Sequence, residues 1–187
     1  TMPRSKETWS WPQAGKRWNK TWKPNPEFWR DKTCIDIGIW KGHLNARALK
    51  EYNCKTIIGV EPFEEHRVDC ERVCPNTKLY KQIEDLPENI SVDIIIMHGL
   101  IKLLGKYWKE QVSLLLSKVN ARFIHVRHGV KNNFTGLDRE TNIYDLKNYD
   151  DMPSYEELVL FFKSKNYLEK ALNKHQGSCF EYKVDAK

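Results

Sequence analysis

From residue 33 onward, short apolar runs typical of β-strands alternate with longer segments that have helical periodicity. Such alternation is typical of a mostly parallel sheet that is covered by helices. Residues 91–98, SVDIIIMH, form the strongest strand candidate, because an unbroken apolar run suits a strand that is buried on both faces. We therefore expect an α/β fold with a doubly wound, mostly parallel sheet.

The remaining expected elements follow from the same periodicities. The expected strands are residues 33–39, 55–62, 77–83, 91–98 and 121–129. The expected helices are residues 43–52, 63–74, 107–119 and a segment that begins with the capping box Ser154 and Glu157. The last two runs, YLEKALNKH and SCFEYKVD, meet at the turn sequence QGS and predict a C-terminal antiparallel hairpin.

The first 32 residues differ in composition from the rest of the chain. They contain eight Lys or Arg against three Asp or Glu, in a chain of net charge +6, and they hold five of the seven tryptophans. We therefore expect a basic, Trp-rich N-terminal arm over residues 1–32 and one domain over residues 33–187. The N-terminal arm could contact RNA or a protein partner, or it could lie across the domain with its tryptophans as buried anchors.

The chain carries no obvious membrane or export signal. No stretch approaches the roughly 18 apolar residues that a membrane-spanning helix needs, and the N-terminal sequence lacks the apolar core of a secretory signal. The five cysteines include no C-x-x-C pair, which indicates reduced thiols rather than a disulfide framework or a zinc ribbon. These features predict a cytoplasmic protein with no membrane segment.

His66, Cys70 and Cys74 recur at helical spacing and raise the question of a metal site. A zinc site ordinarily needs a fourth ligand, and Phe63 and Val73 share the same stripe of the expected helix. A buried apolar face explains the two cysteines more simply, so we expect no metal.

The segment CIDIGIWKGHL, residues 34–44, predicts a buried strand, a glycine-containing turn and the start of a helix. Such a turn places backbone N–H groups at the carboxyl edge of the sheet. Gly38 and Gly42 permit close approach of a ligand, and Glu61, at the end of the next expected strand, can accept both hydroxyls of a ribose. The spacing D-x-G-x-x-x-G, rather than G-x-G-x-x-G, disfavours NAD and leaves another nucleoside as the expected ligand.

The sequences DIGIWKG and GVEPF together resemble the first and second motifs of class I S-adenosylmethionine-dependent methyltransferases. The resemblance covers about residues 30–185 and implies a Rossmann-like fold, S-adenosylmethionine as the cofactor, and methyl transfer. The residues that it assigns to the cofactor are Asp36, Gly38, Trp40 and Gly42 in the first motif, Glu61 at the ribose, Pro62 or Phe63 at the adenine, and Gln82 after the third strand.

Trp40 stands where many members of that family have a third glycine. Other members carry a different residue there, so Trp40 does not exclude the cofactor. Its side chain could point outward and wall the acceptor pocket, or it could pack under the N-terminal arm.

Methyl transfer is an in-line displacement, which needs alignment of the acceptor and, for a hydroxyl acceptor, a base. The candidate catalytic residues lie at the ends of the fourth and fifth expected strands and are His98, His125, Arg127 and His128. Histidine removes protons near neutral pH, and arginine can orient an anionic acceptor. His98 is the first candidate because it follows the most apolar strand, although each histidine could instead be a hydrogen-bonded structural residue.

Two absent motifs narrow the acceptor. The sequence after residue 98 has no N-P-P-Y motif, which argues against methylation of exocyclic amines in DNA, and the chain has no Pro-Cys nucleophile for carbon-5 methylation of cytosine. We expect methyl transfer to oxygen or nitrogen of a small molecule, a nucleotide or RNA. The alternative is a non-catalytic methyltransferase-like protein that binds RNA or a protein partner through residues 1–32.

Overall fold

The computed structural model describes residues 29–42, 50–127, 153–170 and 179–185. The strands among them are β1 (Thr33–Ile37), β2 (Thr56–Val60), β3 (Lys78–Tyr80), β4 (Ile90–His98), β5 (Val119–Arg127), β6 (Tyr167–Lys170) and β7 (Cys179–Val184). The helices are α4 (Glu64–Val73), α5 (Leu100–Leu104), α6 (Trp108–Lys118) and α8 (Tyr155–Ser164), with 3-10 turns η1 (Ile83–Asp85) and η2 (Gly105–Tyr107).

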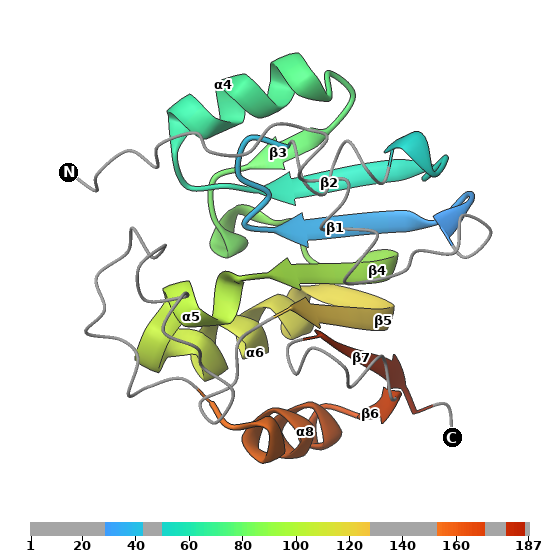
Figure 1. Ribbon diagram of the computed structural model, residues 1–187, viewed down its shortest axis with the longest axis vertical. Helices are drawn as coiled ribbons and strands as arrows, with labels where there is room; N and C mark the ends of the chain where they lie inside the picture. The colour runs from blue at the N-terminus through green and yellow to red at the C-terminus, as the bar shows by residue number, and fades with distance from the viewer. Residues whose placement is uncertain (1–28, 43–49, 128–152, 171–178, 186–187) are drawn as a thin grey trace.

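The described strands form one seven-stranded sheet in the order β3-β2-β1-β4-β5-β7-β6 (Figure 1). The first five strands along the chain pair in parallel, whereas β7 pairs antiparallel with both β5 and β6. This arrangement confirms the predicted mostly parallel α/β sheet with a terminal antiparallel hairpin. Most of the helix expected over residues 43–52, the polar stretch before residue 153 and the turn of the hairpin lie outside the described residues.

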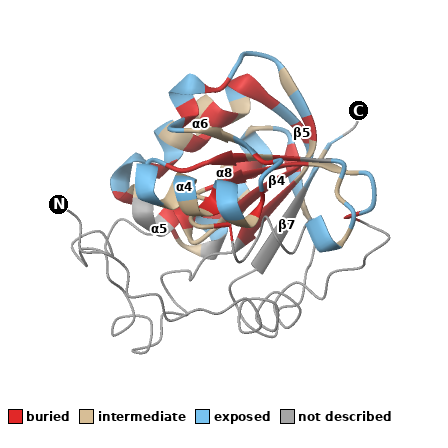
Figure 2. Ribbon diagram, turned by 90° about the horizontal axis from the view of Figure 1, so that it is seen from above, coloured by how far each residue is buried: buried red, intermediate tan, exposed pale blue. Residues whose placement is uncertain are grey.

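Apolar side chains pack on both faces of the sheet, as the unbroken apolar run of β4 predicts. One face carries Ile35 and Ile37 of β1 with Ile95 and Met97 of β4, packed against the apolar stripes of α6 and α8. The opposite face carries Cys34, Ile94 and Ile96, packed with Cys70 and Cys74 of α4. In Figure 2 the central strands are accordingly coloured as buried.

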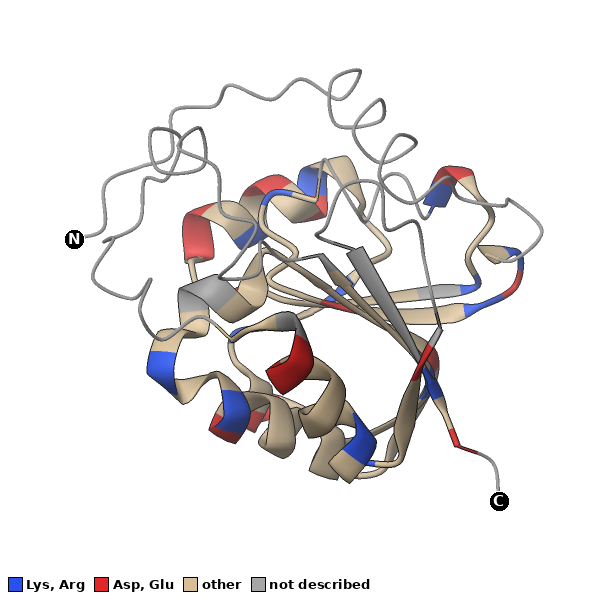
Figure 3. Cartoon of the chain, turned by 60° about the horizontal axis from the view of Figure 1, so that its bottom comes forward, with Lys and Arg blue, Asp and Glu red and all other residues tan. Residues whose placement is uncertain are grey.

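Most charged residues lie on the helices and near the ends of the elements, as Figure 3 shows. The described residues with ionisable side chains in the interior are few, and among them are Asp36, Glu61 and His125. Burial of a charged or titratable group costs free energy unless other groups compensate for it. A buried ionisable group is therefore a marker of a candidate functional site.

Trp29 lies in the core, although it was expected within the N-terminal arm. Its side chain is only 1% exposed and packs in the cluster that contains Cys34 and Ile94. Its ring meets that of His125 edge-on, with 5.4 Å between the centroids. The following residues are tied to the turn before β2, because Asp31 N–H donates to the Asn53 carbonyl at 3.0 Å. Trp29 thus serves as a buried anchor.

The helices α4 and α6 lie within the ranges expected from the sequence, and α8 begins at the predicted capping box. Ser154 Oγ accepts a hydrogen bond from Glu157 N–H at 3.2 Å, which is the interaction expected from the capping sequence at the start of α8. The short helix α5 was not predicted. It begins directly after Gly99, which adopts a left-handed conformation with φ of 69° and turns the chain away from β4.

Candidate functional site

The turn after β1 is fixed to the end of β2 by backbone hydrogen bonds. The N–H groups of Gly38 and Ile39 both donate to the Val60 carbonyl, at 2.8 and 3.1 Å. Gly42 N–H then donates to the Ile39 carbonyl at 3.1 Å, which closes the turn. The turn therefore lies directly beside the residue that follows β2, Glu61.

Three alternate residues of this turn adopt left-handed backbone conformations. The φ angles are 77° at Gly38, 56° at Trp40 and 75° at Gly42. Glycine adopts such angles without cost, whereas a bulky side chain costs about 1–2 kcal/mol there. A glycine at position 40 would thus suit this backbone better, and Trp40 is retained at an energetic cost that other interactions must offset.

The Glu61 carboxylate provides one such interaction. Its side chain is buried, with the whole residue 4% exposed. Oε2 accepts a hydrogen bond from Trp40 N–H at 3.0 Å, and Oε1 accepts one from Phe63 N–H at 3.0 Å. These two backbone donors are held by the turn after β1 and the start of α4, so they set the orientation of the carboxylate at the carboxyl edge of the sheet.

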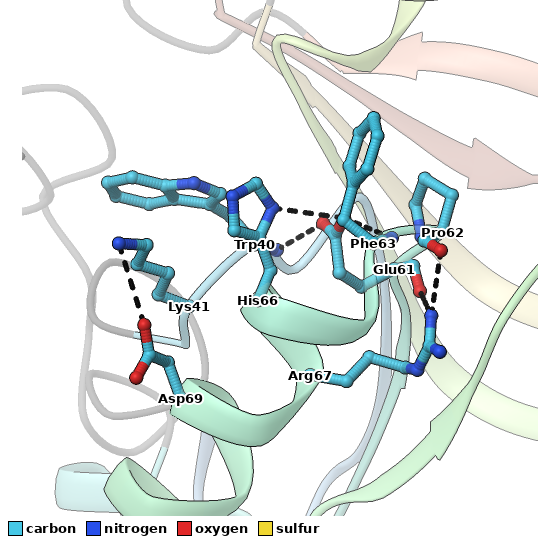
Figure 4. A network of polar contacts seen from close by, with 8 residues as sticks. All are labelled: Trp40, Lys41, Glu61, Pro62, Phe63, His66, Arg67 and Asp69. Carbon is cyan, nitrogen blue, oxygen red and sulfur yellow. Dashed lines mark hydrogen bonds and ion pairs between the residues drawn. The ribbon is translucent and has the colours of Figure 1, made fainter. Parts of the chain in front are cut away.

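Side chains from the first turns of α4 complete the surroundings of Glu61 (Figure 4). His66 Nδ1 lies 3.2 Å from Glu61 Oε1. Arg67 Nη1 donates to the backbone carbonyls of Glu61 and Pro62, at 2.7 and 2.8 Å. These charge-assisted hydrogen bonds to the two carbonyls that follow β2 fix the path of the chain from the strand into the helix.

Aromatic rings lie beside the carboxylate and contact one another through His66. His66 meets Trp40 and Phe63 in edge-on contacts, with centroid separations of 6.0 and 5.3 Å. Lys41 Nζ lies 5.6 Å from the centre of the Trp40 ring and 3.5 Å from Asp69 of α4. Phe63 is 38% exposed and so presents a large apolar surface beside Glu61. The site therefore offers a buried carboxylate next to exposed and half-buried aromatic surface.

A close approach between β2 and the turn after β1 underlies this geometry. A Cβ atom added to Gly59 would lie 2.9 Å from two side-chain carbons of Ile39 and 2.8 Å from Leu79. No real Cβ contact is that short, so only glycine allows the Ile39 side chain to cross β2 at this point. Gly59 thereby helps to position the turn that carries Trp40.

Comparison with known proteins gives a consistent result. No family model matches the chain. A curated protein of Limosilactobacillus reuteri described as an rRNA adenine N-6-methyltransferase is 25% identical, over 76% of this chain and 72% of that protein. The magnesium protoporphyrin IX methyltransferase ChlM from Synechocystis PCC 6803, solved with bound SAH, superposes with a TM-score of 0.64 at 10% identity, over 83% of this chain and 75% of ChlM.

Other methyltransferase structures agree. The plantazolicin methyltransferase BamL superposes with a TM-score of 0.63 at 14% identity, over 90% of this chain and 69% of BamL. The methyltransferase domain of a bacterial Hen1 gives a TM-score of 0.61 at 15% identity, over 83% of this chain and 90% of the domain. The chain has the class I methyltransferase fold. In this fold the turn after β1 and the acid after β2 correspond to the two motifs noted in the sequence.

Two of the four residues expected to be catalytic lie at neighbouring strand ends. His98 is the last residue of β4 and is half-buried, and its register partner is Arg127, the last residue of β5. His125 lies inside the core, 3% exposed and against Trp29. His128 lies outside the described residues. The structure thus brings positions 98 and 127 together at the strand ends and places His125 deeper.

The remaining residues expected at the cofactor, Asp36 and Gln82, lie in different surroundings. Asp36 is fully buried in β1, in register with Gly59 and with Ile96 of β4. Gln82 is exposed, and its side-chain amide donates to Asp85 of η1 at 3.2 Å. Direct hydrogen bonds join Glu61 to the turn at Trp40 and to Phe63, whereas Asp36 is buried within β1, before the turn.

Three residues of this site were not predicted from the sequence as part of it. His66 was considered only as a metal ligand, and Arg67 and Lys41 were not considered, yet all three lie around Glu61 or Trp40. A signal was present, because His66 and Arg67 follow Glu61 within six residues at the start of a predicted helix. Cys70 and Cys74 are buried against the sheet, as expected.

No group of three or more His, Cys, Asp or Glu side chains among the described residues is arranged to hold a metal ion. None of the helices in those residues combines the length and the apolar character needed to cross a membrane.

Proposed function

We propose that the chain is an S-adenosylmethionine-dependent methyltransferase that binds its cofactor at the carboxyl edge of the sheet, between the turn at Gly38–Gly42 and Glu61. The observation that carries this proposal is the Glu61 carboxylate. It is buried, it lies at the end of β2, and two backbone N–H groups orient it. A carboxylate in that position can accept hydroxyl groups of a ribose, as the family resemblance implies.

The residues of the site fit such a cofactor. Glu61 Oε2 accepts one hydrogen bond from the described residues around it, and each carboxylate oxygen can accept about two. Phe63 offers an exposed aromatic face for an adenine ring, and the left-handed turn opens backbone at Gly38 and Gly42. Bound S-adenosylmethionine would supply an electrophilic methyl group.

The chain itself would align the acceptor and remove its proton. His98 is the best placed base, because it ends β4 and is half-buried beside the strand end of β5. His125 lies in the core against Trp29, so we assign it a structural role. Arg127 shares the register position of His98 and is proposed to orient the acceptor.

We further propose that the acceptor is an oxygen or nitrogen atom of a nucleotide or RNA, rather than of an unrelated small molecule. Two observations support this proposal. The Limosilactobacillus reuteri relative is described as an rRNA methyltransferase, and the first 32 residues carry eight Lys or Arg against three Asp or Glu. Basic residues interleaved with tryptophans suit phosphate and base contacts.

Calorimetric titration of the full chain with S-adenosylmethionine and S-adenosylhomocysteine tests the cofactor assignment. Saturable binding of both is expected, and no binding of either would refute it. Transfer of a tritiated methyl group to total RNA, with a pool of small hydroxylated and amine-containing molecules as the comparison, tests the acceptor. Saturable cofactor binding and RNA binding without any transfer would support the non-catalytic alternative instead.

A further inference from the structure

His66 occupies the carboxylate that the cofactor is expected to use. Its Nδ1 atom lies 3.2 Å from Glu61 Oε1, and the same oxygen also accepts from Phe63 N–H at 3.0 Å. Glu61 Oε2 accepts from Trp40 N–H at 3.0 Å. Figure 4 shows the imidazole and the Phe63 ring beside this carboxylate, with the Trp40 indole on the far side of the imidazole.

The number of acceptor positions on Glu61 is limited. A carboxylate has about four lone-pair positions, two on each oxygen. Among the described residues, Oε1 has two hydrogen-bond partners and Oε2 has one, so one acceptor position, on Oε2, is left. A ribose whose two hydroxyls both donate to Glu61 needs two positions. One present partner must therefore leave.

Of the three partners, His66 is the one that can leave at low cost. Trp40 N–H and Phe63 N–H are backbone groups fixed by the turn and by the start of α4. The His66 side chain is 16% exposed, lies in the first turn of α4, and can move by a change of rotamer. Its other described contacts are edge-on ring contacts with Trp40 and Phe63, which are individually weak.

We propose that His66 holds one acceptor position of Glu61 that a ribose diol requires, and that the imidazole leaves Oε1 when a nucleoside ligand binds. This inference rests on the proposed function, because it takes Glu61 as the ribose-binding residue. Through its contact with Glu61, His66 would lower the affinity for the ligand, independently of its ring contacts with Trp40 and Phe63. Removal of the imidazole donor should therefore leave one acceptor position of Glu61 open and raise the affinity for the nucleoside ligand.

The test is calorimetric titration of the full chain with S-adenosylhomocysteine at pH 8. His66→Phe, which keeps an aromatic ring but removes the donor, should bind about fivefold more tightly than the wild-type chain, because one acceptor position on Glu61 Oε1 is then open.

His66→Asn provides the matched variant, because its amide can replace the Nδ1 donor. It should bind about as tightly as the wild-type chain, and thermal unfolding of both variants should show that they fold. A tenfold weakening by His66→Phe that His66→Asn restores would overturn the proposal, since His66 would then support Glu61 rather than compete for it. Equal affinities of His66→Phe and the wild-type chain would also overturn it.

The two hypotheses fail in different ways. Absence of binding by the wild-type chain and by both variants would refute the proposed function, and the inference on His66 with it. Binding by the wild-type chain, together with equal or weaker binding by His66→Phe, would refute only the inference on His66. Tighter binding by His66→Phe than by the wild-type chain and by His66→Asn would support both.

Discussion

The backbone N–H of Trp40 donates a hydrogen bond of 3.0 Å to the carboxylate of Glu61, which joins the turn after β1 to the residue that ends β2. The two residues are 21 positions apart in the sequence. Through this contact the acid takes part in shaping the turn as well as in the proposed ligand binding. Substitution of either residue should therefore change both the free energy of unfolding and the affinity for the ligand. The two effects can be measured separately.

Glu61→Gln should weaken S-adenosylhomocysteine binding by about 2 kcal/mol, because a neutral amide replaces a charged acceptor and presents N–H groups toward the donors of Trp40 and His66. Calorimetric titration at pH 8 measures the change. Glu64→Gln is the matched control, since Glu64 is an exposed acid three residues further on, in the first turn of α4. Equal affinities in the two variants would remove Glu61 from the ligand site.

The left-handed conformation of Trp40 predicts an unusual order of stability between two variants. Trp40→Ala and Trp40→Gly both remove the ring contacts with His66 and Lys41. Only glycine relieves the backbone at a φ of 56°, so Trp40→Gly should be more stable than Trp40→Ala by about 1 kcal/mol. Urea unfolding of the two variants measures this difference. The reverse order would mean that the turn adopts another conformation.

Trp29 offers a test of where the folded domain begins. Its side chain is buried against His125 and the cluster around Cys34. Trp29→Ala should lower the free energy of unfolding by about 3–5 kcal/mol, as is usual when a large core aromatic is truncated. Trp29→Phe should cost clearly less, because it keeps most of the apolar volume. A negligible effect of Trp29→Ala on denaturant unfolding would return residue 29 to the N-terminal arm.

The periodicity of the sequence predicted most of the sheet, because strands buried on both faces leave an unmistakable apolar run such as that of β4. It failed where geometry departs from regular periodicity. Phe63 was expected on the same buried stripe as Cys70 and Cys74, yet it is exposed. The reason is that residue 63 precedes the first residue of α4 and has an extended backbone, with φ of −89°, so helical spacing does not apply to it.

The candidate site was predictable only in part. The glycine turn and Glu61 are carried by local sequence, and both lie where the sequence places them. The contact of His66 with Glu61 depends on the angle at which α4 leaves β2, which Arg67 fixes through the carbonyls of residues 61 and 62. A pattern of residue types along the chain contains no information on that angle. The burial of His125 under Trp29 depends likewise on a contact across nearly 100 residues.

The cysteines should differ in reactivity according to their surroundings. Burial raises the pKa of the Cys70 thiol to about 12, and the neighbouring Cys74 and acidic groups add to the effect. A hydrogen bond with Cys54, at 3.8 Å between the sulfurs, and burial raise the pKa of Cys34 far above its ordinary value. Because the thiolate is the reactive form, both thiols should resist alkylation near neutral pH.

Iodoacetamide labelling at pH 7.5, followed by peptide mass spectrometry, should therefore modify the half-buried Cys54 well before Cys34 or Cys70. A sample unfolded in guanidinium is the control, in which the three should react at similar rates. Rapid labelling of Cys70 in the folded chain would show that the face of α4 packed on the sheet opens readily.

His98 carries the last prediction, which concerns the chemical step. It ends β4 beside the last residue of β5, and Gly99 then turns the chain away into α5. If His98 is the base for a hydroxyl acceptor, His98→Ala should keep its affinity for S-adenosylhomocysteine but lower methyl transfer to the RNA or nucleotide acceptor by about 100-fold or more. Thermal unfolding and calorimetric titration of the variant supply the controls for folding and for cofactor binding.

The pH profile separates a base from a merely neighbouring side chain. The unprotonated imidazole is the active form, so the wild-type rate should rise through the range in which histidine loses its proton, and this rising limb should be absent in His98→Ala. Loss of cofactor affinity in the variant would instead place His98 in the cofactor pocket. Full methyl transfer by His98→Ala would remove the residue from the mechanism and leave alignment of the acceptor as the main source of rate, because proximity alone can lower the barrier by several kcal/mol.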